Sequence, residues 1–234
     1  MTHARPGILL QARLASTRLP GKALELIEGR PLLEHCLRRL ESAGVARVVL
    51  ATTSLDEDSA LCDLATRLGI AVYRGSDTDV LGRMAGAAQA FDLDPVIRAT
   101  GDNPAVDIDA AGRVLAALNG LHADYVCEDG LPVGAAVEAV TRAALLRADR
   151  EADDPGDREH VTTWVKRRSD LWNLAFPAPP VPLRCPDLRL TVDTPADLAY
   201  VRSLFARAAA EQPSLRALIG AAEHAVSHQK REVA

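Results

Sequence analysis

Short apolar runs alternate with helix-period segments of about ten residues through the first half of this chain. Four runs are typical of buried strands: 7–12, 47–51, 70–73 and 95–99. Three segments between them have the residue spacing of helices: 31–44, 58–68 and 80–91. Strands that alternate with helices form parallel βαβ units, so the pattern predicts an α/β fold with a mostly parallel sheet flanked by helices.

The regular alternation of predicted strands and helices ends after about residue 119. Further strands are predicted at 123–127, 133–140 and 188–192. Further helices are predicted at 142–150, 159–168 and 195–210. Five prolines fall within residues 177–186, which therefore cannot form regular structure.

Composition and charge exclude several classes of protein. The net charge is -5, whereas a general nucleic-acid binder is normally basic. No stretch approaches the ~18 apolar residues of a membrane span, and the apolar run near the N-terminus is too short for a signal peptide. The 4 cysteines are far apart without a CxxC pair, which argues against a zinc site or a disulfide framework. We therefore expect a cytoplasmic protein with free thiols.

A cationic loop directly follows the first predicted strand. Arg13, Arg18 and Lys22 lie within ten residues, together with two hydroxyls and Gly21. Ligands of open α/β sheets bind at the carboxyl ends of strands, and a glycine lets the backbone approach a phosphate closely. The three cations would neutralise a triphosphate. The spacing matches neither a Walker A loop nor a dinucleotide fingerprint, and composition alone leaves a solvated surface loop as the alternative.

Two aspartates also follow predicted strands. Asp102 ends the fourth strand and Asp193 ends the late strand, so both are expected at the same rim of the sheet as the cationic loop. Mg²⁺ binds one or two carboxylates while it keeps water and phosphate ligands. Alone, Asp193 could instead cap the helix that begins at Pro195, a role that Thr194 could equally fill. Together with the loop, the pair favours a magnesium site.

These motifs resemble the cytidylyltransferases that make CMP-activated sugars. The likeness spans 8–109, with QARLASTRLPGKALELIEGRPLLEH, VVLATTS, RGSDTDVLGR and TGDNPAVD, and resumes at VGAAVEAVTRAAL, REHVTTWV and LTVDTPADLAYVR. The spore-coat polysaccharide biosynthesis type is most similar, and the 3-deoxy-manno-octulosonate and acylneuraminate cytidylyltransferases are similar but more distant. The resemblance covers about nine-tenths of the chain and implies a Rossmann-like nucleotidyltransferase fold.

The resemblance also implies roles for individual residues. Asp102 and Asp193 would hold Mg²⁺, and Arg13, Arg18 and Lys22 would act in catalysis. Implied nucleotide contacts are Gln11, Ala12, Arg13, Ser16, Arg18, Gly21, Lys22, Arg74, Asp77, Arg83 and Thr100. Candidate acceptor contacts are Asp79, Glu138, Arg158, Glu159 and His160. The residues themselves leave structural alternatives open. Asp79 could be a helix N-cap, Arg83 a solvated helix residue, and His160 a structural histidine whose hydrogen bonds are satisfied within the protein.

The implied reaction is transfer of CMP from CTP to a small acidic acceptor, with release of pyrophosphate, by a homodimer. The chain is then one nucleotidyltransferase domain, 1–234. Its parts are a nucleotide-binding half (7–120), an acceptor and dimerisation subregion (121–186) and a returning strand and helix (187–215). Ala136 stands where the spore-coat type usually carries aspartate, so no acceptor is carried over.

Two rival functions stay open. A nucleotide-sugar-dependent glycosyltransferase would use a DxD motif, which Asp77, Thr78 and Asp79 spell, although here it precedes a helix. A non-catalytic nucleotide-binding protein would not need both the cationic loop and the two carboxylates. Release of pyrophosphate from CTP separates these possibilities from the preferred one.

Overall fold

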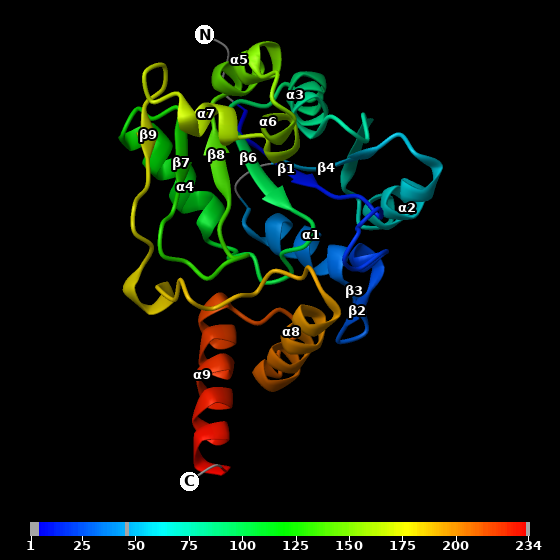
Figure 1. The fold of residues 1–234 in the computed structure, drawn as a ribbon, viewed down its shortest axis with the longest axis vertical. Helices are drawn as coiled ribbons and strands as arrows, with labels where there is room; N and C mark the ends of the chain where they lie inside the picture. The colour runs from blue at the N-terminus through cyan, green and yellow to red at the C-terminus, as the bar shows by residue number, and fades with distance from the viewer. Residues whose placement is uncertain (1–4, 45–46, 233–234) are drawn as a thin grey trace.

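The computed structural model describes residues 5–44 and 47–232, with side chains up to residue 224. Within these residues, seven strands form one sheet in the order β5-β4-β1-β6-β8-β7-β9 (Figure 1). Strands β5, β4, β1 and β6 are parallel, whereas β8 is antiparallel to both β6 and β7. The bounds are β1 Gly7–Gln11, β4 Arg47–Thr53, β5 Ala71–Gly75, β6 Val96–Thr100, β7 Tyr125–Cys127, β8 Glu138–Val140 and β9 Leu174–Ala175. The expected mixed, mostly parallel sheet is confirmed.

Helices cover both faces of the sheet, and α9 extends away from the body (Figure 1). One core takes buried residues from α1, α2, α4, α8 and α9, and the other from α3, α5 and α7. The α-helices are α1 Leu32–Ser42, α2 Ser59–Arg67, α3 Val80–Ala90, α4 Ala110–Gly120, α5 Arg142–Glu151, α6 Pro155–His160, α7 Thr163–Arg167, α8 Pro195–Ala208 and α9 Leu215–Glu232. Short elements are the hairpin β2 Leu26–Ile27 and β3 Arg30–Pro31, and the 3₁₀ helices η1 Lys22–Leu24, η2 Asp56–Asp58 and η3 Val181–Leu183.

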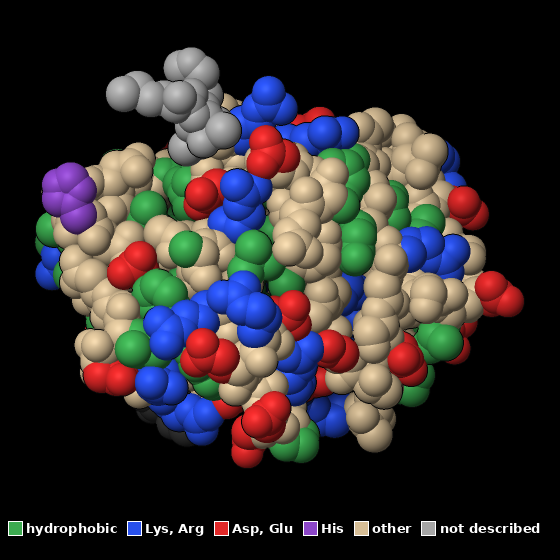
Figure 2. Space-filling view, turned by 90° about the horizontal axis from the view of Figure 1, so that it is seen from above, with side chains coloured by type: hydrophobic (Ala, Val, Ile, Leu, Met, Phe, Trp, Pro, Cys, Tyr) green, Lys and Arg blue, Asp and Glu red, His purple; other side chains and the backbone are tan. Residues whose placement is uncertain are grey.

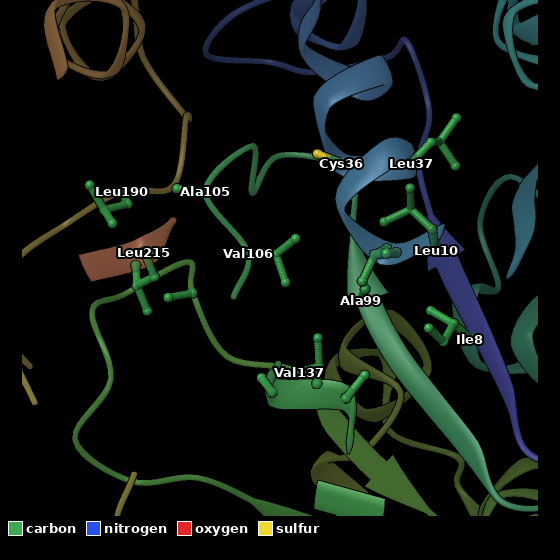
Figure 3. Packing of buried hydrophobic residues seen from close by; sticks show 14 of the residues in the cluster. Ile8, Leu10, Cys36, Leu37, Ala99, Ala105, Val106, Val137, Leu190 and Leu215 are labelled. Atoms are coloured by element: carbon green, nitrogen blue, oxygen red, sulfur yellow. The ribbon is translucent and has the colours of Figure 1, made fainter. Parts of the chain in front are cut away.

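The two-sided burial of the sheet explains the unbroken apolar runs. Along β1, Ile8 and Leu10 belong to one core and Leu9 to the other. A strand that is buried on both faces carries a continuous apolar sequence, because neither face meets water. Figure 3 shows part of the first core, to which Ile8 and Leu10 of β1, Ala99 of β6 and Leu37 of α1 contribute. This packing holds the carboxyl ends of β1 and β6 side by side.

The second half differs from expectation at several places. The segment 177–186 was expected to have no regular structure but contains η3, and β9 and α9 were not predicted. The helix predicted at 159–168 is two helices, α6 and α7, because Asp154 caps a helix that already begins at Pro155 and the chain turns at Val161. The strand predicted at 133–140 is shortened to β8. Within the described residues, the predicted strand 188–192 forms an isolated bridge to Val133, because Pro132 and Gly134 interrupt the segment that it faces.

Lys and Arg side chains are interspersed with Asp and Glu on the end of the molecule shown in Figure 2. Among the residues that the structure describes, none of the helices is long and apolar enough to cross a membrane.

Candidate active site

A cavity of about 350 Å³ lies at the carboxyl ends of β1 and β6. Its wall contains most of the residues singled out from sequence: Gln11, Ala12, Arg13, Ser16, Arg18, Lys22, Arg83, Thr100, Asp102, Glu159, His160 and Asp193. The sheet places them there because β1 and β6 are parallel neighbours, so their carboxyl ends share one rim. Loops and helix ends from distant parts of the chain complete the wall.

Lys22 joins the two aspartates at one end of this cavity. Its ammonium donates hydrogen bonds to Asp102 Oδ2 at 3.1 Å, to Asp193 Oδ1 at 3.0 Å and to the carbonyl oxygen of Val192 at 2.8 Å. Burial raises the pKa of Asp193, but Lys22 and Arg18 outweigh that effect and lower it overall. Both carboxylates therefore share Lys22, and Asp193 also pairs with Arg18 and Arg189.

The local structure keeps Asp193 available for this contact. The N-cap of α8 is Thr194, whose hydroxyl accepts the Asp197 N–H at 3.2 Å, while the Asp197 carboxylate accepts the Thr194 N–H at 2.8 Å. This capping box satisfies the first turn of the helix. The alternative in which Asp193 is the N-cap is wrong, and its side chain faces Lys22 instead.

The cationic loop is anchored by a buried carboxylate that the sequence analysis did not identify. Asp58 is fully buried and accepts the Leu14 N–H at 2.7 Å and the Thr52 hydroxyl at 3.2 Å, and it also accepts the Thr53 hydroxyl. Gly21 closes the loop by donating its N–H to the Leu14 carbonyl, at φ 71°, a conformation that favours glycine. In sequence, Asp58 resembles an ordinary first residue of a helix.

The opposite wall comes from α6 and α3. Arg13 pairs with Glu159 at 3.1 Å and donates to the carbonyl oxygen of Asp77, also at 3.1 Å. Arg83 is buried and donates to the carbonyl oxygen of Ser76, so it is not the solvated helix residue that sequence left open. Arg13 thus links the cationic loop to α6 and to the segment that precedes α3.

The chain leaves α6 through a strained turn next to the cavity. Val161 is buried and has φ 60° and ψ −60°, and the Thr162 N–H donates to the His160 carbonyl at 2.6 Å. This is a γ-turn of the rare kind, which costs about 1–3 kcal/mol for a residue with a branched side chain. The turn places exposed His160 in the cavity wall and directs Thr162 into the sheet.

Arg98 is a further cation in the cavity wall that sequence reasoning missed. It lies in the middle of β6, where it interrupts an apolar run, and that interruption was the only available signal. Its Nε donates to Gln11 Oε1 at 3.1 Å and its Nη1 donates to Glu138 Oε2 at 2.5 Å. The cavity is therefore lined by five Lys or Arg side chains and three carboxylates, Asp102, Glu159 and Asp193.

Glu138 lies behind Arg98, outside the cavity wall. It also accepts hydrogen bonds from the Tyr125 hydroxyl at 2.6 Å, the Thr162 hydroxyl at 3.0 Å and the Lys166 ammonium at 3.1 Å. Burial raises the pKa of Glu138, but Arg98, Lys166 and the Tyr125 hydroxyl outweigh burial and lower it to about 2. The carboxylate is ionised at neutral pH and holds Arg98 in place.

The structure does not bring every predicted residue into the wall. Those outside it are Gly21, Arg74, Asp77, Asp79, Glu138 and Arg158. Arg74 instead donates to the carbonyl oxygens of Thr53 at 2.9 Å and Leu55 at 2.7 Å. Asp79 accepts the Gly82 N–H at 2.9 Å, which confirms the alternative that it caps α3, and it also pairs with Arg158. The side chains of Arg74 and Asp79 are therefore held by contacts within the protein and do not face the cavity.

Asp102 and Asp193 suit a divalent cation with oxygen ligands. No cluster of three or more His, Cys, Asp or Glu side chains that could hold a metal exists in the described part of the chain. Mg²⁺ does not require such a cluster, because it takes one or two carboxylates and completes its shell with water and phosphate. The two carboxylates already share one cationic partner, Lys22, so the donor set fits.

An open α/β sheet with a cationic loop and paired carboxylates at one rim defines a nucleotidyltransferase. The chain belongs to the cytidylyltransferase family, whose model matches residues 8–225. The expected family, fold and enzyme class are thereby confirmed.

Relatives with names and structures support this assignment. The spore coat polysaccharide biosynthesis protein SpsF of Bacillus subtilis is 31% identical over 215 residues, which cover 89% of each chain. A cytidylyltransferase structure from Leptospira borgpetersenii is 28% identical, with a TM-score of 0.89 over 96% of each chain. A CTP complex of CMP:2-keto-3-deoxy-manno-octonic acid synthetase shares the fold at 20% identity, with a TM-score of 0.64 over 87% of this chain and 99% of that one.

Proposed function

We propose that this enzyme transfers CMP from CTP to a small acidic acceptor, with release of pyrophosphate, and that it requires Mg²⁺. The acceptor is an acidic sugar, a phosphate or a phosphonate. The observation that carries the proposal is the convergence of Asp102 and Asp193 on Lys22 at 3.1 Å and 3.0 Å, beside the cationic loop. Positive charge for a polyphosphate and hard oxygen ligands for its metal then lie in one cavity.

Three cations are assigned to the triphosphate. Arg13, Arg18 and Lys22 would bind it and neutralise charge on the departing pyrophosphate, because transfer of this kind depends on positioning and charge neutralisation. Arg18 pairs with Asp193 at 2.9 Å and Lys22 with both aspartates. We expect both cations to exchange these carboxylates for phosphate oxygens when nucleotide binds.

Other residues in the wall are assigned to the nucleotide and the metal. Gln11, Ala12, Ser16, Arg83 and Thr100 line the same cavity and are proposed nucleotide contacts. The Thr100 hydroxyl donates to Asp102 Oδ1 at 2.6 Å and orients that carboxylate. A magnesium ion held by Asp102 and Asp193 would polarise the α-phosphate.

The acceptor contacts are narrower than the resemblance implied. Glu159 and His160 line the cavity, whereas Asp79, Glu138 and Arg158 are held outside its wall by their own hydrogen bonds. We therefore retain Glu159 and His160 as acceptor contacts. The homodimer and the cytoplasmic location stay predictions.

A pyrophosphate-release screen tests this proposal. CTP, UTP, ATP and GTP are each combined with 3-deoxy-manno-octulosonate, N-acetylneuraminate, glucose 1-phosphate and 2-hydroxyethylphosphonate, with and without Mg²⁺. We expect release with CTP and one acidic acceptor, in the presence of Mg²⁺ only. Binding of CTP without release for any acceptor would support a non-catalytic nucleotide-binding protein, and turnover of a nucleotide-sugar without pyrophosphate would support a glycosyltransferase.

A further inference from the structure

Arg98 enters the cavity wall from β6 and not from the cationic loop. In the sheet, its Cα pairs with Leu9 of β1 on one side and with Glu138 of β8 on the other. The three cations proposed for the triphosphate all come from the loop that follows β1. Arg98 comes from the interior of β6, two residues before Thr100. It therefore differs from that set in the element that carries it.

Hydrogen bonds join Arg98 to the helices that carry the proposed acceptor contacts. Glu138 accepts from Arg98 at 2.5 Å and from the Thr162 hydroxyl at 3.0 Å. Thr162 follows His160 across the γ-turn, and His160 lines the cavity together with Arg98. Arg98 and His160 therefore belong to one connected wall.

The guanidinium of Arg98 keeps one nitrogen, Nη2, for a ligand. Its Nε is bonded to Gln11 and its Nη1 to Glu138, whereas Nη2 has no hydrogen-bond partner in the portion of the chain described. A guanidinium is planar and presents its N–H groups in a fork that matches carboxylate and phosphate oxygens. Because its Nε and Nη1 are already held, Arg98 offers Nη2 with little further loss of side-chain freedom on binding.

The wall of the cavity carries more positive than negative charge, because its five Lys or Arg side chains face three carboxylates. Glu138 is shared between Arg98 and Lys166, at 2.5 Å and 3.1 Å, so one carboxylate faces two cations. Glu138 thus orients Arg98 without cancelling the charge of the cluster. An anion in the cavity would meet this excess.

We propose that Arg98 binds the anionic group of the acceptor, with Glu138 as the residue that positions it. The ligand chemistry is an oxyanion, either the carboxylate of an acidic sugar or a phosphate or phosphonate group. The inference deepens the proposed function and rests on it. Arg98 would then be the residue that makes the enzyme prefer acidic acceptors over neutral ones.

Steady-state kinetics of Arg98→Ala and Arg98→Lys test the proposal. Each variant is assayed with CTP, Mg²⁺ and the member of the acceptor panel that the wild type uses best, and CTP binding is measured by calorimetry. Because hydrogen bonds to a charged group are lost, we expect the acceptor KM of Arg98→Ala to rise about 10- to 100-fold. The KM for CTP should stay within about twofold, and Arg98→Lys should retain part of the acceptor affinity because it keeps the charge. Arg142→Ala is the matched control, since Arg142 forms an exposed pair with Asp92 away from the cavity.

Two further measurements separate binding from a structural effect. Methylguanidinium should restore part of the acceptor affinity of Arg98→Ala. The preference of the wild type for the acid over its neutral methyl ester should disappear in that variant. If the wild type turns over acceptors with a carboxylate, the oxyanion is the carboxylate of an acidic sugar. If it turns over phosphates or phosphonates, the oxyanion is that group.

Three results would overturn the inference. An unchanged acceptor KM in Arg98→Ala would exclude the contact, and a raised KM for CTP alone would place Arg98 in the nucleotide site. If the wild type binds CTP but turns over no acceptor, the proposed function fails and this inference fails with it. That last result differs from the first two because the wild type itself is inactive.

Discussion

Lys22 donates a hydrogen bond of 3.0 Å to Asp193, although 171 residues separate the two in the chain. The same ammonium reaches Asp102 at 3.1 Å. Since Lys22 pairs with both carboxylates, replacement of Lys22 or of either aspartate changes the charge balance of the other two. The charge of Lys22 therefore links the cationic loop to the two proposed metal ligands, Asp102 and Asp193.

Replacement of Lys22 should abolish most of the turnover. Lys22→Ala removes a cation proposed to stabilise the pyrophosphate charge, and loss of one such stabiliser lowers kcat by at least about 100-fold. Pyrophosphate release measures the effect, with circular dichroism as the test of folding. Near-normal turnover by a folded variant would contradict the role assigned to Lys22.

Substitutions of Asp193 and Thr194 should have different effects, one on turnover and the other on stability. Thr194→Ala removes the hydroxyl of the capping box and should lower the free energy of unfolding by about 1 kcal/mol. Asp193→Asn leaves that cap intact and should instead lower turnover by at least about 100-fold, the scale for one electrostatic stabiliser. Urea unfolding and pyrophosphate release are measured on both variants. Equal effects of the two substitutions on stability would argue against separate roles.

Asp58 should matter for stability and for CTP binding. Asp58→Asn weakens a buried acceptor of three hydrogen bonds, including that from Leu14 in the cationic loop. We expect a loss of about 1–3 kcal/mol of unfolding free energy, the cost of leaving buried polar groups poorly satisfied, and a higher KM for CTP. Asp56→Asn is the control, because Asp56 lies in the same η2 turn but is exposed. Equal stability of the two variants would exclude the anchoring role.

Glu138 should contribute a pH-dependent part of the stability. Its pKa is lowered from 4.5 to about 2 in the folded chain, against the effect of burial, by Arg98, Lys166 and Tyr125. A group with a depressed folded pKa stabilises above its unfolded pKa, and that stability is lost as the pH falls through the folded value. The full contribution is about 3 kcal/mol, of which about 2 kcal/mol should be lost between pH 7 and pH 3.

Urea unfolding of the wild type and Glu138→Gln at these two pH values measures the contribution. Glu138→Gln should be less stable than the wild type at pH 7. The difference between their free energies of unfolding should be about 2 kcal/mol smaller at pH 3. Glu151→Gln, at an exposed pair with Arg147, should show little difference at either pH. A gap that does not change with pH would mean that Glu138 is not held ionised by its partners.

Local sequence was sufficient for the four parallel strands β1, β4, β5 and β6 and for one rim of the site. The apolar run 7–12 and its neighbours predicted parallel strands, and each of Lys22, Asp102 and Asp193 follows one of these runs or the late extended segment. Parallel strands that are adjacent must end at one rim, so these residues were expected to meet before their contacts were known. Periodicity and chain order carry this information.

The second wall of the cavity depended on the tertiary structure. Arg98 and Glu138 are 40 residues apart and meet because β6 and β8 pair antiparallel in one register. Asp58 reaches Leu14 across 44 residues, and Asp79 faces its own helix and Arg158. A sequence determines which residues can form a strand or cap a helix, because those preferences are local. Which charged side chains share a low-dielectric space is decided only when distant segments pack, because charge pairing depends on distance in space.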